Sequence, residues 1–504
     1  MTTDRPIDLD ALTLADVRSG VLRGKSVTVL GFARSGISLA RFFADAGADV
    51  TVYDGRPADQ LADAFAALGG RHVRFAGGTD APPATAWAGA ALVATSPSIN
   101  PDFPTTEPRL REALRALVAR RAAGDHTIPA LVSEADLFLR LCPAPTIGVT
   151  GTKGKTTTSS LIAAILAEDP AHPVALGGNI GIPLVERLPE LTPDHRVVTE
   201  LSELQLPTLS RGTTIAVYTN VTSDHLDRHG SLENYRAAKR RLAELVDADG
   251  ALVLNADDPV VAAYAGLGPT RSVFYRIGRP LSGGVGVDED WIVADGVGRV
   301  MPVGELRIPG RHNVSNALAA VATALVFDLA PDAIRRAASA FTGVEHRLEP
   351  VATVDGVRFV NDSQGTQPDA VIAALRAFDP PVVLIAGGRD KDVDLSGLPP
   401  VVAERAAAAV LIGESGPRLE RLFRAAGLKE TARAASLDDA VRAADAIARD
   451  RLATGAPTPA TVLLSPAAAS FDMFVDYAAR GRAFKDAVAR LAAERADREE
   501  GSDR

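Results

Sequence analysis

The chain has 504 residues and a formal net charge of −9 at pH 7; 46% of the residues are hydrophobic and 23% are charged. This balance is typical of a globular chain, and at about 150 residues per domain the length predicts roughly three domains. The negative charge gives no reason to expect a nucleic acid partner. No apolar run reaches the ~18 residues of a membrane helix, so we expect no membrane insertion. The single cysteine, Cys142, excludes an intrachain disulfide, and the acidic N-terminus lacks a signal-peptide pattern, so we expect a cytoplasmic protein.

The first predicted domain, residues 1–132, opens with the outline of a dinucleotide-binding βαβ unit. The pattern is a strand over 26–30, a glycine turn, a helix over 37–46 and a strand over 49–53. Asp54 follows the second strand, where such units place an acid. The glycine fingerprint is imperfect, because Ala33 replaces its middle glycine. A further strand over 91–94 leads into a proline-rich loop, at the sheet edge where open α/β sheets bind ligands.

The second predicted domain, residues 133–348, carries a glycine-rich loop between a strand and a helix. Residues 148–157 read GVTGTKGKTT, and the helix is predicted over 159–168. Backbone N–H groups of such a turn point at one place, which suits a polyphosphate. Lys155 would then reach the outer phosphates and Thr156 a magnesium ion. The spacing differs from that of the common P-loop, but a GKT framed by glycines at this junction predicts nucleotide phosphate binding.

Two polar residues of this domain follow predicted strands. The strands are expected over 196–199, 214–219 and 251–254. Glu200 follows the first strand and His225 the second, at the same sheet edge as the phosphate loop. Together with the Thr156 hydroxyl they would hold magnesium beside a triphosphate. Taken alone, His225 is explained as a surface-loop histidine and Glu200 as a solvated acid, so the prediction depends on their shared position.

Lys239 lies at the edge of an apolar stripe on a predicted helix. The stripe consists of Tyr235, Ala238, Leu242, Leu245 and Val246. One interpretation is a lysine that extends from a core helix to solvent. The other is a partly buried amine that loses its proton easily, takes up CO₂ as a carbamate and so supplies a negative metal ligand.

Asn313 and Asn316 share one face of a predicted helix, three residues apart. Either is explained as a packing or capping amide. Together with Arg347 in the segment HRLE, they predict a nucleotide contact at a domain seam.

The third predicted domain, residues 349–504, has nearly all-apolar strands, as a sheet buried on both faces requires. These strands are expected over 357–360, 382–385, 408–412 and 461–464. Three of them end in polar or glycine-rich segments, which are NDSQGT at 361–366, AGGRDKD at 386–392 and SPAAASFD at 465–472. Functional residues at consecutive carboxyl ends predict one pocket.

In chain order, the motifs resemble those of the Mur ligase family over about residues 25–490. They are GTKGKT, GGNIGIP, ELSELQL, NVTSDHLDRHG, YRAAK, LNADD, GRHNVSNALAA, HRLE, NDS and LLSPAAASFDMF. The SPAAASFDMF and YRAAK segments and the first block resemble the family member that adds glutamate. The resemblance implies an α/β fold of three domains: a Rossmann-like N-terminal domain, a central P-loop ATPase-like domain and a Rossmann-like C-terminal domain.

The resemblance also implies an activity in peptidoglycan precursor synthesis. The enzyme would be an ATP-dependent amide ligase that joins glutamate, expected as the D-isomer, to UDP-N-acetylmuramoyl-L-alanine through an acyl phosphate. It would use ATP and magnesium at two sites, bind only small molecules and act as a monomer.

The family motifs assign a role to individual residues. Phosphate contacts would come from Gly151, Thr152, Lys153, Gly154, Lys155, Thr156 and Thr157. The catalytic residues would be Lys155, His225 and Lys239, and the metal ligands Thr156, Glu200, His225 and carbamylated Lys239. Further ATP contacts would be Asn313, Asn316, Arg347 and Asp362, the last on the ribose. The UDP-sugar substrate would contact Arg34, Ser35, Asp54, Arg56, Ser96 and Asn179. The glutamate pocket would contain Thr366, Lys391, Ser465 and Phe471 or Phe474.

The sequence departs from the family pattern at three positions. Gln364 stands where a lysine is common, Gln367 where an asparagine is common, and Glu203 is added after Glu200. The loss of a positive charge leaves an L-glutamate ligase open as an alternative.

Other readings explain less of the chain. Two alternatives of the same class are another Mur-type ligase and a folylpolyglutamate synthetase, of which the latter lacks a UDP-binding first block. A nicotinamide-dependent oxidoreductase would use Gly31, Gly36 and Asp54 but leaves GTKGKT unexplained. A switch GTPase would need a guanine-specificity motif, which does not follow the loop.

Overall fold

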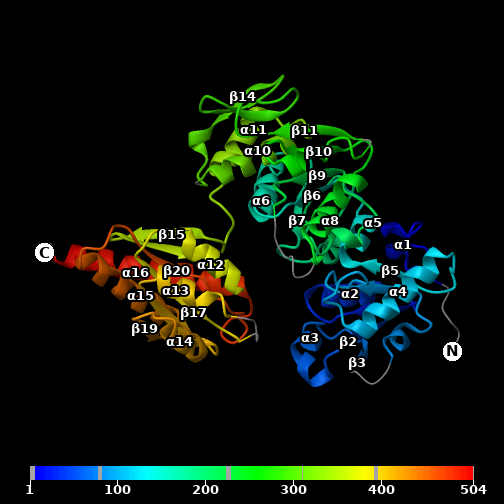
Figure 1. Ribbon diagram of the computed structural model, residues 1–504, viewed down its shortest axis with the longest axis horizontal. Helices are drawn as coiled ribbons and strands as arrows, with labels where there is room; N and C mark the ends of the chain where they lie inside the picture. The colour runs from blue at the N-terminus through cyan, green and yellow to red at the C-terminus, as the bar shows by residue number, and fades with distance from the viewer. Residues whose placement is uncertain are drawn as a thin grey trace. The chain divides into compact units, whose positions relative to one another are not determined.

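A computed structural model of the chain describes residues 6–77, 82–222, 229–268, 270–308, 310–390 and 395–502, with side chains as far as residue 496 (Figure 1). Contacts divide the chain into two compact units, with the division between Phe341 and Thr342. The described residues form three sheets, two in the first unit and one in the second. The predicted α/β class is confirmed, whereas the domain limits at 132 and 348 stay predictions.

The first sheet is wholly parallel and has the order β3-β2-β1-β4-β5. Its strands are β1 (Ser26–Leu30), β2 (Asp49–Asp54), β3 (Arg74–Gly77), β4 (Leu92–Thr95) and β5 (Ala130–Ser133). Its helices are α1 (Leu14–Ser19), α2 (Arg34–Asp45), α3 (Ala62–Ala66) and α4 (Pro108–Ala122), with 3-10 turns η1 (Ala58–Leu61) and η2 (Pro83–Trp87). Buried residues of α1 and α2 form one core with the sheet, and those of α4 form another. This is the doubly wound arrangement that the βαβ outline predicts.

The central sheet has the order β14-β13-β12-β11-β10-β9-β6-β8-β7. Its parallel strands are β6 (Thr146–Thr150), β7 (Val174–Gly178), β8 (Arg196–Glu200), β9 (Ile215–Tyr218), β10 (Ala251–Asn255) and β11 (Arg271–Tyr275). The strands β12 (Val285–Asp288), β13 (Trp291–Ala294) and β14 (Gly298–Pro302) extend it; β12 pairs with β11 in parallel, and β13 and β14 continue as antiparallel neighbours.

Helices cover both faces of the central sheet (Figure 1). One core contains α6 (Lys155–Leu166), α10 (Arg311–Val326) and α11 (Pro331–Ala340). The other contains α8 (Leu232–Leu245), α9 (Pro259–Ala262) and part of α5 (Glu134–Leu141), which leads from the first sheet into the second. Short 3-10 turns are η3 (Leu184–Glu190), η4 (Leu206–Thr208) and η5 (Val303–Glu305).

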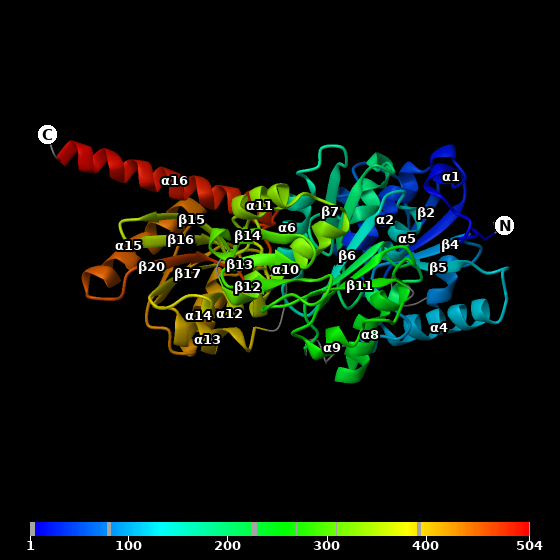
Figure 2. The same cartoon turned by 90° about the horizontal axis from the view of Figure 1, so that it is seen from above.

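The second unit is a three-layer α/β domain with the sheet order β15-β16-β20-β17-β18-β19 (Figure 2). Its strands are β15 (Glu349–Val354), β16 (Val357–Asn361), β17 (Val382–Gly387), β18 (Ala408–Ile412), β19 (Thr431–Arg433) and β20 (Ala460–Leu464). Among the described strands of this sheet, only β15 and β16 pair in antiparallel fashion. One face is covered by α15 (Leu437–Ala453) and α16 (Tyr477–Ser502), the other by α12 (Pro368–Arg376), α13 (Leu398–Arg405) and α14 (Gly416–Ala425).

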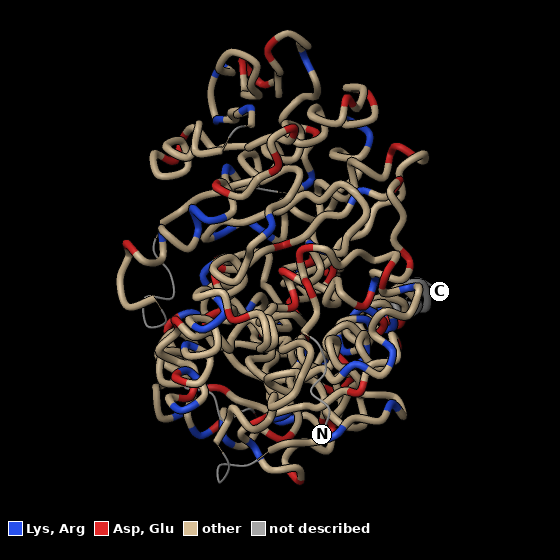
Figure 3. Tube along the Cα trace, turned by 90° about the vertical axis from the view of Figure 1, so that its right-hand side faces the viewer, with Lys and Arg blue, Asp and Glu red and all other residues tan. Residues whose placement is uncertain are grey.

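Lysine and arginine residues are interspersed with aspartate and glutamate residues along the described chain (Figure 3). None of the helices in the described ranges is both long and apolar enough to span a membrane.

Candidate active site

The loop GTKGKT connects β6 to α6 in the central sheet. Gly151 has a φ of 151° and Gly154 a φ of 86°, a region that L side chains rarely adopt. A β-carbon at Gly151 would lie 1.9 Å from Thr219 Oγ1, and one at Gly154 would lie 2.5 Å from Asn316 Oδ1. Both positions therefore require glycine.

Helix α6 begins at Lys155, so the predicted start at residue 159 was wrong. The left-handed Gly154 ends the loop abruptly, and the helix begins with the next residue. Thr156 and Thr157 consequently lie in the first turn, whose N–H groups are not used within the helix. This correction places Lys155, Thr156 and Thr157 at a helix N-terminus, which favours an anion.

Lys155 and the residues after β9 hold the loop in shape. Lys155 Nζ donates to the carbonyls of Gly151 and Thr152, each at 2.9 Å. Asn220 Oδ1 accepts from Lys153 N at 2.9 Å, and its Nδ2 donates to Lys153 O at 3.0 Å. Asn220 is the first residue of the motif NVTSDHLDRHG, but the motif alone assigned no role to it.

Glu200 ends β8 and is 2% exposed. The strand register pairs it with Val149, two residues before Gly151. Its Oε1 accepts from Asn179 Nδ2 at 2.8 Å. Its Oε2 is buried and has no hydrogen-bond partner among the described residues. A buried carboxylate oxygen of this kind is costly unless a cation or donor binds it, so the site fits a divalent metal ion.

Lys239 is completely buried on α8, not partly buried at a stripe edge as predicted. Its Nζ donates to Thr150 Oγ1 at 3.2 Å and to Gly151 O at 3.1 Å. The Thr150 hydroxyl in turn donates to Leu201 O, the carbonyl that follows Glu200, at 2.8 Å. Thr150 thus joins Lys239, the phosphate loop and the strand end that carries Glu200.

Four further residues predicted for this site are Thr156, Asn313, Asn316 and His225. Thr156 is buried, and Asn316 Nδ2 donates to Asn313 Oδ1 at 3.0 Å, so the two amides share a helix face as predicted. His225 lies outside the described residues. Within the described ranges, no three His, Cys, Asp or Glu side chains gather to hold a metal.

A pocket of about 380 Å³ lies at the first βαβ turn. Gly31, Asp54, Glu107 and Leu204 are among its lining residues. Asp54 Oδ2 accepts from Phe32 N at 2.8 Å, and Arg56 binds the same carboxylate through its backbone and side chain. Burial by itself would raise the pKa of Asp54, but these hydrogen bonds lower it below the ordinary value.

Arg34, Ser35 and Ser96, which were also predicted to contact the UDP-sugar, are not among the residues that line this pocket. Ser96 is buried after β4, with its hydroxyl 3.4 Å from that of Ser98, and Ser35 lies in the first turn of α2. The Arg34 side chain donates to the carbonyls of Gly178, Asn179 and Gly181. Arg34 therefore connects the first sheet's helix α2 to the GGNIG segment.

In the second unit, the polar strand ends meet as predicted. The strands β16, β20 and β17 are neighbours, so the segments after them lie at one sheet edge. Ser465 Oγ donates to Asp362 Oδ2 at 2.6 Å. Burial raises the pKa of Asp362 to about 6, although the bonds from Ser465 and Leu348 N favour its charged form.

The remaining predicted residues of this unit differ in exposure. Arg347 is exposed, Thr366 is half-buried, and Thr366 N donates to Gln364 O at 2.7 Å. Phe471 is 63% exposed, whereas Phe474 packs against the core. Lys391 lies outside the described residues.

Comparison with known proteins adds the decisive observation. The family model of the Mur ligase middle domain matches residues 149–324, and that of the Mur ligase glutamate ligase domain matches residues 346–468. The chain belongs to the Mur ligase family. The family that the ordered motifs indicate is therefore confirmed.

Relatives match this chain over nearly its whole length. A protein named UDP-N-acetylmuramoylalanine–D-glutamate ligase from Symbiobacterium thermophilum is 38% identical over 484 residues, covering 94% of this chain and 100% of the relative. A protein of the same name from Roseiflexus sp. is 39% identical, covering 93% of this chain and 99% of its own. The structure of UDP-N-acetylmuramate-alanine ligase from Thermotoga maritima shares the fold, with a TM-score of 0.51, 19% identity and coverage of 93% and 99% of the two chains.

One buried cation of this Mur ligase was not singled out by sequence. Arg480 on α16 is 1% exposed and donates to the carbonyls of Ser363, Ala468 and Ala469 and to Ser363 Oγ. Burial lowers the pKa of Arg480 to about 10. It ties together two of the three polar strand ends. Its sequence surroundings, AARGRA, look like an ordinary exposed helix face.

Glu134 is a second buried group that sequence reasoning missed. It begins α5, is 2% exposed, and accepts a long hydrogen bond of 3.4 Å from Val185 N. Burial raises the pKa of Glu134 from 4.5 to about 7, although Val185 N and the nearby Arg34 favour its charged form. The pKa of Glu134 is higher in the folded than in the unfolded state, so loss of its proton destabilises the fold. The contribution of Glu134 to stability is therefore fully present below about pH 4.5 and is lost as the pH rises through about 7.

We therefore expect Glu134→Gln to stabilise the first unit at pH 8. The amide has the same shape and no charge, so the gain in free energy of unfolding should approach ~3 kcal/mol at pH 8 and nearly vanish at pH 4. Urea unfolding followed by tryptophan fluorescence measures this unit alone, because Trp87 and Trp291, the two tryptophans of the chain, both lie in it. Glu233→Gln, at an exposed first-turn position of α8, is the matched control. Equal stability of Glu134→Gln and the wild type at pH 8 would contradict the prediction.

Proposed function

We propose that this Mur ligase is an ATP-dependent enzyme that joins D-glutamate to UDP-N-acetylmuramoyl-L-alanine in peptidoglycan precursor synthesis. The observation that carries the proposal is the convergence at Thr150, which links the phosphate loop, buried Lys239 and the strand end of Glu200. The names of relatives that match almost end to end support the substrates.

The reaction has two steps. A carboxylate oxygen of the alanyl group attacks the γ-phosphorus of ATP, and ADP leaves. The amine of glutamate then attacks the carbonyl carbon of the acyl phosphate, an amide forms, and inorganic phosphate leaves with one former carboxylate oxygen. Holding both substrates in line and neutralising the phosphoryl charge are what the protein must supply.

The phosphate loop would bind the triphosphate. The first-turn N–H groups of α6 and the loop Gly151 to Gly154 would face the phosphates. Lys155, now bonded to two loop carbonyls, would turn to the β- and γ-phosphates when they arrive. Asn313, Asn316, Arg347 and Asp362 are proposed for the rest of the nucleotide.

Magnesium would be held by Thr156, Glu200, His225 and Lys239. A divalent ion supplies charge neutralisation to the transferring phosphoryl group. Glu200 has a buried oxygen ready to accept a cation, and Asn179 fixes the other oxygen. A carbamate on Lys239 would add a second carboxylate-like ligand beside the loop. Magnesium generally keeps waters and phosphate oxygens as its other ligands.

The substrates would occupy the two strand-end regions. The pocket at Asp54 suits the uridine diphosphate part, with Arg56 and Ser96 beside it. The edge with Ser465 and Thr366 is proposed for glutamate, together with Lys391 and Phe471 or Phe474. We expect a cytoplasmic monomer.

The proposal is tested by ADP release from purified protein with ATP, magnesium and UDP-N-acetylmuramoyl-L-alanine. Release should require added glutamate and should be at least about a hundredfold faster with the D-isomer than with the L-isomer, since a site that pairs with both carboxylates discriminates strongly. Turnover with L-glutamate but not with D-glutamate would contradict the proposal and support the L-glutamate alternative. No turnover with either isomer would contradict it.

A further inference from the structure

The segment 201–211 follows Glu200 and leads to β9; we call it the coupling loop. Leu204 in this loop lines the pocket that also contains Gly31 and Asp54. At its start, Leu201 N donates to Val149 O at 2.9 Å, beside the phosphate loop. The coupling loop therefore extends from the proposed UDP pocket to the proposed metal ligand Glu200, and its position affects both.

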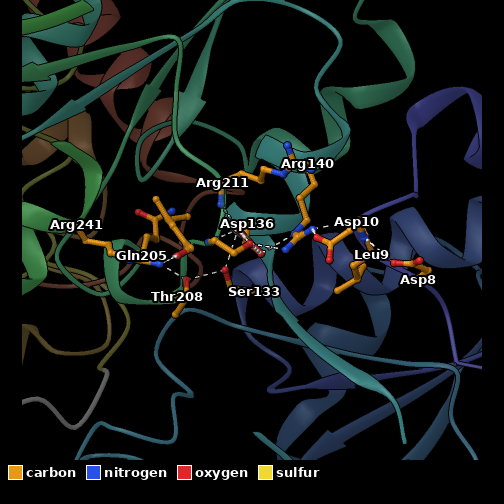
Figure 4. A network of polar contacts seen from close by, with 12 residues as sticks. Asp8, Leu9, Asp10, Ser133, Asp136, Arg140, Gln205, Thr208, Arg211 and Arg241 are labelled. Atoms are coloured by element: carbon orange, nitrogen blue, oxygen red, sulfur yellow. Dashed lines mark hydrogen bonds and ion pairs between the residues drawn. The ribbon is translucent and has the colours of Figure 1, made fainter. Parts of the chain in front are cut away.

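Asp136, in the first turn of α5, anchors the end of the coupling loop (Figure 4). The side chain is buried, and its carboxylate accepts from Ser210 N at 2.7 Å, Ser210 Oγ at 2.8 Å and Arg211 N at 3.2 Å. It also accepts from Arg140 Nε at 2.9 Å. Charge-assisted bonds to a buried carboxylate are among the stronger ones, so this end of the loop is firmly held.

A second set of bonds connects α5 to the middle of the coupling loop (Figure 4). Ser133 Oγ accepts from Asp136 N at 3.1 Å and lies 2.7 Å from Thr208 Oγ1. Thr208 Oγ1 donates to Gln205 O at 2.6 Å, and Gln205 Oε1 accepts from the N and Oγ of Ser202 at 2.9 Å each. The bonds thus reach from Asp136 to within two residues of Glu200.

The same cluster contacts the first sheet's leading segment and helix α8. Arg140 donates to Leu9 O at 3.2 Å and to Asp10 Oδ1 at 2.8 Å. Ile7 N donates to Ala91 O at 3.0 Å, which joins this segment to the start of β4. Arg241, two residues after Lys239, donates to Leu209 O at 3.2 and 3.3 Å. Asp136 therefore lies between the first sheet and two of the proposed metal ligands, Glu200 and Lys239.

We propose that Asp136 is a positioning residue that fixes the coupling loop and thereby sets the metal affinity of Glu200. It acts through Arg140, Ser210 and the Ser133–Thr208 contact and touches neither substrate nor metal. The inference depends on the proposed function in one respect, the assignment of Glu200 as a metal ligand. Asn cannot replace Asp136, because an amide N–H₂ would face the donors of Arg140 and Ser210.

The test is Asp136→Asn, measured by Mn²⁺ binding in electron paramagnetic resonance with a non-hydrolysable ATP analogue present. Mn²⁺ should bind about tenfold more weakly, as outer contacts of metal ligands commonly produce. Hydrogen–deuterium exchange should be faster in 201–211, while the KM for D-glutamate should be unchanged. Wild-type Mn²⁺ affinity together with wild-type exchange in the coupling loop would overturn the inference.

Two more variants make the result specific. Asp438→Asn is the matched control, because Asp438 also pairs with an arginine four residues on, Arg442, at 2.9 Å in the second unit; it should leave Mn²⁺ binding unchanged. Thr208→Val keeps the Asp136–Arg140 pair and the side-chain shape, so it tests the inference if Asp136→Asn does not fold. It should weaken Mn²⁺ binding about threefold, and unchanged binding would count against the inference. If the proposed function is wrong, the wild-type protein will not ligate glutamate, while the differences in Mn²⁺ binding between the variants will still be observed.

Discussion

Lys239→Ala should lower the ligase rate by ~10³-fold or more, because it removes a proposed metal ligand beside the transferring phosphoryl group. The wild-type amine is buried and bonded to Thr150 and Gly151, so its removal leaves a cavity next to the phosphate loop. A short carboxylic acid such as acetate can enter such a cavity and supply the negative charge of the missing carbamate. We therefore expect millimolar acetate to restore part of the rate, measured as ADP release.

The carbamate itself is open to direct measurement. Wild-type protein equilibrated with ¹³CO₂ should give a carbamate resonance in ¹³C NMR that Lys239→Ala lacks. Arg236→Ala, an exposed position on the same helix, serves as the control and should keep the wild-type rate. A wild-type rate in Lys239→Ala, or a rate loss that no small acid restores, would argue against the carbamate.

Lys155→Ala should lower kcat by about 10³-fold, since one cation that stabilises developing phosphoryl charge is commonly worth this much. The loop should keep its shape, because Asn220 holds Lys153 independently of Lys155. Phosphate release with all substrates present measures the effect, and the melting temperature should change little.

Charge alone should not restore this activity. Lys155→Arg is expected to stay slow, because the larger guanidinium cannot occupy the space between two loop carbonyls. Lys429→Ala removes an exposed lysine of the second unit and should be silent. Turnover at the wild-type level in Lys155→Ala would refute the role given to the phosphate loop.

The sequence predicted those parts of the fold and site that local patterns specify. The strands β8, β16 and β20 were predicted from apolar runs that end in glycine or polar residues. A strand buried on both faces is apolar throughout, so it does not show the alternation of a half-exposed strand. Glu200 was found from its place after such a strand. The α6 start was missed because it depends on the left-handed Gly154, which a glycine-rich string does not reveal.

Contacts between distant segments could not be predicted in the same way. Arg34 was predicted to contact the UDP-sugar, but no pattern predicted that its side chain also bonds carbonyls 144 to 147 residues away. Glu134 and Arg480 are buried although charged helix residues are usually exposed, and Asp136 accepts hydrogen bonds from a loop more than 70 residues further along the chain. Their environments arise only from tertiary packing, so no local pattern identifies them.

The most direct test of the account follows the oxygen atoms of the reaction. UDP-N-acetylmuramoyl-L-alanine with ¹⁸O in both carboxylate oxygens is turned over with ATP, magnesium and D-glutamate, and the phosphate is analysed by mass spectrometry. An acyl phosphate formed at this site predicts one ¹⁸O atom in each inorganic phosphate released and one in the amide. Phosphate free of ¹⁸O, formed together with the amide product, would contradict the account.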